Sequence, residues 1–392
     1  MVLQLFRGAK AQPEAQKASS VAPLVTFQGG GRVAWSPRDA TSLTRNGFAG
    51  NPVGFRCVKL IAEAAAAVPI VVQDAERRYA EHPLVALLNR PNPGQGMAEL
   101  LENLYGQLLL TGDGYLEAAV DESLSQPAEL YVLRSDRMQV VPGADGWPVA
   151  YEYAVGAKKH RFDLRDGFAP VLHIKSFHPQ NDHYGLSPMQ AAASALDVHS
   201  AASRWSKALL DNAARPSGAI IYRGTDGMGA LGSEQYQRLV DELETHHQGA
   251  RNAGRPMLLE GGLDWKPMGF SPSDMEFQKT KDSAAREIAL AFGVPPMLLG
   301  LPGDNTYANY AEANRAFYRL SVLPLVSKTM SALGNWLGEA FGGGLKVQVD
   351  QDAVPALAVE REAQWRRVAV ADFLTPAEKR AMLGLPPLAD NE

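Results

Sequence analysis

The sequence predicts an α+β protein with more than one domain. Its 392 residues are enough for two or three domains, and its share of hydrophobic and charged residues is ordinary for a globular chain. Segments with helical spacing of apolar residues occur together with short strand-like segments. Two further features organise the chain: a long alanine-rich segment that begins at Ser187, and two helical segments between Phe270 and Phe341 that a loop separates.

The first clear helix begins at Asn51-Pro52, because Asn caps a helix well and Pro suits the first helical position. Its apolar face includes Cys57, the single cysteine, which we expect to be a small buried hydrophobe. Pro69 ends this helix and Ile70–Val72 is a candidate strand. The preceding residues, Met1 to about Arg45, lack a periodic pattern and are expected to form a flexible or loosely packed arm.

More helices and strands follow up to residue 177, and together they make an α+β domain. The strands are rich in β-branched and aromatic residues, and Gly143–Gly146 is a turn between two of them. The expected helices lie within 82–93 and 97–111, and the expected strands are 115–120, 130–133, 138–141, 150–153 and 172–175.

Ser187-Pro188-Met189-Gln190 has the pattern of a capping box, with Gln in place of Glu. The helix that it opens runs to about Ala214, which corresponds to roughly 40 Å at about 1.5 Å per residue. Its many alanines allow close packing against other helices. A β–α–β insert then follows, with expected strands at 219–222, 257–260 and 263–266 and an expected helix at 233–248.

The next helix is capped by Ser271 and ends at Gly293, because the two prolines that follow forbid its continuation. After a loop rich in Gly, Pro, Asp and Asn, a further helix begins near Asn309. It runs toward Phe341 and should be kinked at Pro324. A glycine hinge, one strand and two short helices complete the chain, at 342–344, 345–349, 360–372 and 375–383.

Charge and motifs exclude several functions. The net charge of −5 argues against a classical basic nucleic-acid-binding protein. We find no Walker loop, no dinucleotide fingerprint and no nucleophile elbow. No apolar run has the length of a membrane helix, and the N-terminal residues do not form a signal peptide, so we expect synthesis in the cytoplasm.

Several of these segments resemble the portal proteins of HK97-type tailed phages, a group that includes the portals of gene transfer agents. The resemblance covers about residues 48–342, and its motifs stand in the family's order. It is carried by Asn51-Pro52 and by the segments 82–93, 249–256, 258–262, 288–301 and 307–310.

The resemblance implies the portal fold, with each part assigned to a range of this chain. The parts are an N-terminal arm (1–47), an α/β wing (48–185), a first stem helix (186–215), an α/β clip insert (216–270), a second stem helix (271–293), a tunnel loop (294–310), a kinked wing helix (311–344) and a small helical crown with the C-terminal region (345–392).

The resemblance also implies function. It implies a ring of twelve copies at one capsid vertex, through which double-stranded DNA passes without sequence specificity during packaging and ejection. The expected partners are a terminase, a head–tail adaptor and the major capsid protein, with no membrane, cofactor or catalytic residue. The virion portal vertex, reached from assembly in the host bacterial cytoplasm, is the expected location. An infectious phage, a prophage and a gene transfer agent all remain open as the source.

Two groups of residues are candidates for contacts in such a ring. Asp304, Asn305, Thr306 and Tyr307 form the expected tip of the DNA-facing tunnel loop. In the clip, Arg251 and Arg255 flank a glycine-rich turn and are candidates for contact with terminase, adaptor or a neighbouring subunit.

Two other functions were weighed against the portal. A metal-dependent soluble hydrolase would use the region of His173, His178, Asp182 and His183, because imidazole and carboxylate groups are proper metal ligands. These residues have no recognised metal-site spacing, so solvated or structural histidines are favoured. A non-viral scaffold would instead pair the long helices inside a dimer.

Overall fold

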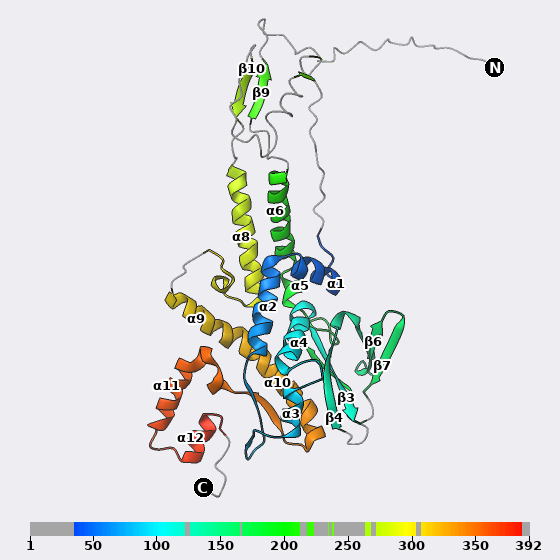
Figure 1. Cartoon of the computed structure of the whole chain (residues 1–392), viewed down its shortest axis with the longest axis vertical. Coiled ribbons are helices and arrows are strands. Elements are labelled where there is room, and N and C mark those ends of the chain that lie inside the picture. Colours follow the sequence, from blue (N-terminus) through cyan, green and yellow to red (C-terminus); the bar gives the residue numbers. More distant parts are fainter. Residues whose placement is uncertain are drawn as a thin grey trace, which may run out of the picture. The chain divides into compact units, whose positions relative to one another are not determined.

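The computed structural model describes residues 35–121, 126–164, 167–211, 218–222, 234, 237–238, 263–267, 272–302 and 307–385. Every described residue after Trp35 belongs to one structural unit that begins at Ser36. Figure 1 shows that this unit combines helices with small sheets, which confirms the predicted α+β class.

The main core lies between helices α2 (Pro52–Ala66), α4 (Met97–Thr111) and α10 (Leu323–Gly338). Helix α2 packs against α4 along its length and also contacts α10. Leu104, Tyr105 and Met330 are completely buried there. The structure thus confirms both predicted helices. Asn51 caps the start of α2, as expected, and Gly112 caps the end of α4.

In the described residues, the strands form three antiparallel sheets of three strands each and one antiparallel pair. The strands have the orders β11-β1-β2, β4-β3-β8, β5-β6-β7 and β10-β9. Their bounds are β1 Ile70–Gln73, β2 Arg78–Tyr79, β3 Asp113–Asp121, β4 Gln126–Leu133, β5 Met138–Pro142, β6 Pro148–Val155, β7 Lys158–Asp163, β8 Val171–Lys175, β9 Gly218–Tyr222, β10 Leu263–Pro267 and β11 Lys346–Val349. Strands β2 and β7 were not predicted.

A second hydrophobic cluster lies in the β-rich lobe. Strands β3, β5, β6 and β8 contribute to it, and its most buried member is Tyr115. The ring of Tyr115 stacks on His173 at 4.2 Å and meets Tyr151 edge-on at 5.7 Å. These contacts join the two sheets of the lobe, because Tyr115 lies on β3 and Tyr151 on β6.

The long helix predicted from Ser187 is present in two pieces, α5 (Pro188–Ala191) and α6 (Ala193–Asp211), with Ala192 between them. The Ser187 side chain accepts the Gln190 N–H at 2.9 Å, as the capping pattern predicted. Helix α8 (Pro272–Phe292) packs against α6. Trp205 and Phe277 stack across this pair with 4.2 Å between their rings.

The predicted irregularity at Pro324 takes the form of a π-helical segment. Helix α9 (Tyr307–Phe317) continues as η4 (Tyr318–Val322) before α10 begins. Proline has no N–H for the helical ladder, and its ring crowds the carbonyl four residues earlier. The wider hydrogen-bond spacing of a π-helix accommodates both effects immediately before Pro324.

Three boundaries differ from the sequence-based expectation. Helix α9 begins at Tyr307, inside the loop expected at 294–310. Residues 40–49, assigned mostly to the arm, form α1 (Ala40–Leu43) and π-helical η1 (Thr44–Ala49). Strand β11, assigned to the crown region, pairs with β1 of the expected wing, with Ile70 opposite Val349. Pairing partners so far apart in sequence carry no local signal, which is why the strand was placed with its neighbours.

Short helical elements fill the remaining connections. The last of them, expected at 375–383, begins with a complete capping box of Thr375 and Glu378 and is followed by Gly384 with a φ of 75°. Their bounds are α3 Pro83–Asn89, η2 Ser135–Arg137, η3 Pro296–Leu299, η5 Glu339–Phe341, η6 Gln351–Ala353, η7 Pro355–Leu357, α11 Ala358–Ala369 and α12 Pro376–Met382.

Candidate functional site

The segment that follows α8 is held in place by hydrogen bonds to η4 and to α8 itself. At the end of α8, Gly293 has a φ of 66°, and its carbonyl accepts the Ser321 hydroxyl at 2.6 Å. A side chain at position 293 would meet that hydroxyl, since a Cβ there lies 2.7 Å from it. This hydrogen bond attaches the start of the loop to η4, which is followed directly by α10.

The next residues extend this rigid start. The Val294 side chain is buried. The 3-10 helix η3 begins at the second of the two prolines that follow, and Gly300 ends it in the left-handed conformation. Arg286 of α8 donates to the carbonyl of Pro302. The described part of the loop is therefore held at both Gly293 and Pro302, so that only a short stretch connects it to α9.

Helix α9 and η4 present their cations already paired. Arg315 lies 2.9 Å from Glu312 and 3.9 Å from Glu360, and Arg319 lies 3.9 Å from the same Glu360 carboxylate. A phosphate would have to compete with these carboxylates for each guanidinium. Arg315 and Arg319 are therefore expected to bind phosphate more weakly than guanidinium groups without a carboxylate partner would.

The predicted contact residues lie mostly outside the described residues. This holds for Asp304, Asn305 and Thr306 of the loop and for Arg251 and Arg255 of the insert. Tyr307 is the first residue of α9. Their roles remain predictions.

Asn51 connects the core to the long helix α6. Its Oδ1 accepts the N–H groups of Val53 and Gly54 at 3.0 and 3.2 Å, which caps α2. Its Nδ2 donates to the Ser200 hydroxyl at 3.1 Å and lies 3.1 Å from Nδ1 of His199. One buried amide thus satisfies two helices, and burial lowers the pKa of His199.

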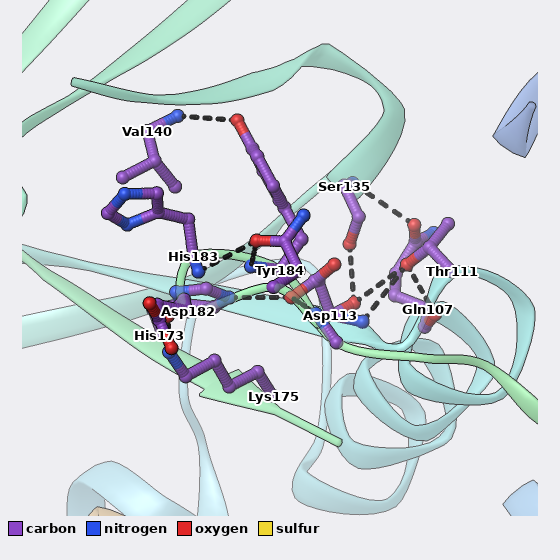
Figure 2. Close-up of polar contacts among 12 residues, drawn as sticks. Gln107, Thr111, Asp113, Ser135, Val140, His173, Lys175, Asp182, His183 and Tyr184 are labelled. Atoms are coloured by element: carbon purple, nitrogen blue, oxygen red, sulfur yellow. Dashed lines mark hydrogen bonds and ion pairs between the residues drawn. The ribbon is translucent and has the colours of Figure 1, made fainter. Parts of the chain in front are cut away.

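A second polar connection centres on Asp113, at the junction of α4 and β3 (Figure 2). Its carboxylate lies 2.8 Å from Nε2 of His173 and accepts the Gly185 N–H at 2.8 Å. Its carbonyl accepts the hydroxyls of Thr111 and Ser135, at 3.0 and 2.6 Å. The aspartate therefore joins α4, β8 and the segment that leads into α5.

The backbones meet directly beside this carboxylate. The Gly112 carbonyl accepts the Ser176 N–H at 2.8 Å, and Gly112 itself has a φ of 86°. A Cβ at Gly185 would lie 2.0 Å from the Gly112 carbonyl oxygen. Only glycine fits this contact, because neither backbone can move away. Sequence reasoning noted His173 but missed Asp113, whose partners are distant in the chain.

The metal-site alternative is not supported by the histidine geometry. His173 is buried against Asp113 and Tyr115, whereas the half-buried His178 accepts the Gln180 N–H at 3.1 Å through Nδ1. Asp182 uses its carbonyl to accept Lys175. Across the described residues, no group of three or more His, Cys, Asp or Glu side chains is arranged to hold a metal ion.

Cys57 likewise has the environment of a packing residue. It is completely buried in the main core, and burial raises the pKa of its thiol to about 12. A thiol with a raised pKa is a poor nucleophile at neutral pH. The polar connections at Asn51 and Asp113 position helices and strands relative to one another.

Comparison with known protein families gives the class of this chain. The family model described as phage portal protein matches residues 52–384. The chain belongs to this family, whose members are structural proteins.

Solved structures and a curated relative agree with this assignment. The chain is 70% identical to a chain in the neck of an empty gene transfer agent (GTA) particle, computed with C6 symmetry; the match covers 91% of this chain and 96% of that chain, with a TM-score of 0.74. For the neck of a native GTA particle, computed with C12 symmetry, the identity is 68% over the same shares, with a TM-score of 0.73. The portal protein of Enterobacteria phage HK97 is 28% identical over 294 residues, which are 72% of this chain and 66% of that protein.

In the described part of the chain, no helix is both long and apolar enough to cross a bilayer.

Proposed function

We propose that this chain is the portal subunit of a phage-like particle of the gene transfer agent type. Twelve copies form a ring at one capsid vertex, and double-stranded DNA passes through the ring during packaging and ejection. The observation that carries the proposal is the 68% identity, over 91% of the chain, to a protein in a native GTA neck with twelvefold symmetry.

The parts of the chain receive matching roles. Helices α6 and α8 are the stem, and β9 and β10 belong to the clip, where Arg251 and Arg255 contact terminase, adaptor or a neighbouring subunit. Residues 304–307 are the part of the tunnel loop that touches DNA. The major capsid protein surrounds the ring.

The charge distribution supports passage rather than tight binding of DNA. The chain carries a net charge of −5, and Arg315 and Arg319 are paired with glutamates close to the loop. Each phosphate that a protein neutralises adds salt-dependent affinity, which would retard a moving duplex. A framework with paired cations holds the loops in position without fixing the DNA.

Native mass and negative-stain images of the purified protein test the ring. Twelve copies of 42.3 kDa give about 510 kDa and a closed ring with a central hole, as cyclic symmetry requires. A stable dimer under all conditions tried would contradict the proposal.

The loop assignment needs a separate test. Deleting residues 304–306 should leave the ring intact, because Gly293 and Pro302 hold the framework independently. It should lower the amount of DNA packaged or retained in particles, measured by quantitative PCR of nuclease-protected DNA. Particles of the deletion variant with a normal DNA content would contradict the assignment of the tunnel loop.

A further inference from the structure

Helices α11 and α12 almost lack a buried face. Helix α11 buries only Val368, and α12 buries no residue. By contrast, α2 and α10 bury six and seven residues respectively. Helices in proteins owe most of their stability to packing of an apolar face, and these two short helices lack that support within the described chain.

The main core ends before these helices begin. Leu357 is the last residue of the described chain that belongs to either hydrophobic cluster. Helix α11 is held instead by polar contacts to Asp352, which lies 2.6 Å from Nε of Arg361 and accepts the indole N–H of Trp365 at 3.0 Å. Helix α12 is attached to α11, since Arg361 donates to the Leu383 carbonyl at 3.1 Å and Gln364 to the Met382 carbonyl at 3.2 Å. These polar contacts set the direction of the two helices.

Large apolar side chains are nevertheless exposed on this segment. Phe373 is 87% exposed and Val370 is 75% exposed, at the connection between the two helices. We name the following residues the C-terminal apolar set: Val359, Trp365, Val370, Phe373 and Met382. These five exposed side chains lie on one short segment of the chain, so they are more concentrated than the scattered single exposed apolar residues that are normal on a protein surface.

We infer that the C-terminal apolar set packs against the next copy of this chain in the ring. The inference rests on the proposed ring and specifies where the copies touch. In a cyclic ring, each copy presents two different surfaces, and each surface meets the other type on the neighbour. The segment is suited to such a contact because its own core does not cover it and its polar contacts fix its direction.

A second copy is the favoured occupant for two reasons. The related neck structures are symmetric assemblies, and the match includes 96% of each related chain, so this architecture recurs around an axis. The segment also carries both signs of charge, with Glu360 and Glu362 beside Arg366 and Arg367. An apolar surface with mixed charges suits a protein neighbour better than the uniformly negative surface of DNA.

Thiol labelling tests the inference in the full-length ring. Phe373→Cys places a thiol in the set, and Phe177→Cys is the control, because Phe177 is 83% exposed in the β-rich lobe. Cys57 gives little background, since it is buried and its pKa is raised to about 12. In nuclease-treated rings free of other proteins, the thiol at 373 should react about tenfold or more slowly with a maleimide than in urea.

Photo-crosslinking separates contact with a neighbour from burial within one chain. A benzoylphenylalanine at position 373 should give a covalent dimer on a denaturing gel when the ring is irradiated. Loss of the ring in Phe373→Cys and Val370→Cys, with intact wild-type and Phe177→Cys rings, would also support the inference.

Other outcomes overturn it. Labelling of residue 373 in the ring at its urea rate, or a crosslink confined to one chain, would show that no neighbour covers the set. Protection that arises only when DNA or another protein is added would assign the surface to that occupant. If the wild-type chain forms no ring, the proposed function fails first and the inference fails with it; an intact ring with an exposed residue 373 removes the inference alone.

Discussion

Asn51→Ala is expected to destabilise the protein far more than loss of an ordinary helix cap. The Asn51 side chain is almost completely buried and forms hydrogen bonds with two helices, α2 and α6. It accepts the N–H groups of Val53 and Gly54, and it donates to Ser200 beside His199 on α6. Alanine removes both sets of hydrogen bonds and leaves polar groups of two helices without partners in a dry environment.

The magnitude follows from these two losses. Removal of an N-cap costs about 1 kcal/mol, with a range of about 0.5–2. A buried polar group left without its partner costs about 1–3 kcal/mol more. We therefore expect the free energy of unfolding to fall by about 2–4 kcal/mol. Asn51→Ser keeps an acceptor for the cap but is too short to reach α6, so it should recover about 1 kcal/mol of that loss.

The assay is urea unfolding followed by tryptophan fluorescence, at one protein concentration and in one oligomeric state for all variants. The position of α6 should also change, so hydrogen exchange is expected to be faster in both α2 and α6 for Asn51→Ala. An Asn51→Ala variant within about 0.5 kcal/mol of wild type would refute the reasoning, as would faster exchange confined to α2.

Three further predictions follow from the same framework. The pKa of His199 is lowered, chiefly by burial and also by Lys281. The unfolded chain therefore binds the proton more readily, and the free energy of unfolding should fall as the pH drops below about 6.5. The variant His199→Gln should flatten this pH dependence in urea titrations. Gly185→Ala should lower the free energy of unfolding by about 3 kcal/mol or more, or prevent soluble expression, because its Cβ would overlap the Gly112 carbonyl. Gly156→Ala has open space around its Cβ, so it should lower the free energy of unfolding by only about 1–2 kcal/mol, because of its positive φ. Gly106→Ala, inside α4 with no atom near its Cβ, should raise the melting temperature by the equivalent of about 0.5–1 kcal/mol.

Local chemistry explains which parts of the fold the sequence predicted. Caps at Asn51, Ser187 and Thr375 act within three residues of the helix start, so their pattern is complete in a short stretch of sequence. Gly293 and Gly384 are equally local, because the left-handed conformation that ends a helix favours glycine wherever it occurs. The order of helices and most strands follows from signals of this kind.

Long-range contacts explain what the sequence did not predict. Strand β11 needs β1 as its partner, and Asp113 needs His173 and Gly185, yet neither pairing has a spacing rule. A histidine within the apolar strand β8 was a usable signal, since a buried imidazole requires a polar partner. That signal identifies the need for a partner but does not choose Asp113 among the acidic residues of the chain.

The distribution of buried apolar surface divides the described chain into parts with different sources of stability. From α2 to η7, the described side chains form two hydrophobic clusters, the larger of which includes Ile61 and Leu333, so this part is stabilised by intrachain contacts. Beyond Leu357, helix α11 is held by Asp352 and helix α12 by hydrogen bonds from α11, and the segment carries exposed apolar side chains that a ring would cover. Assembly is therefore expected to order the C-terminal helices while leaving the core almost unchanged. A ring built in this way joins subunits that are already folded, and the surface that completes its contacts gains stability only when the neighbour arrives.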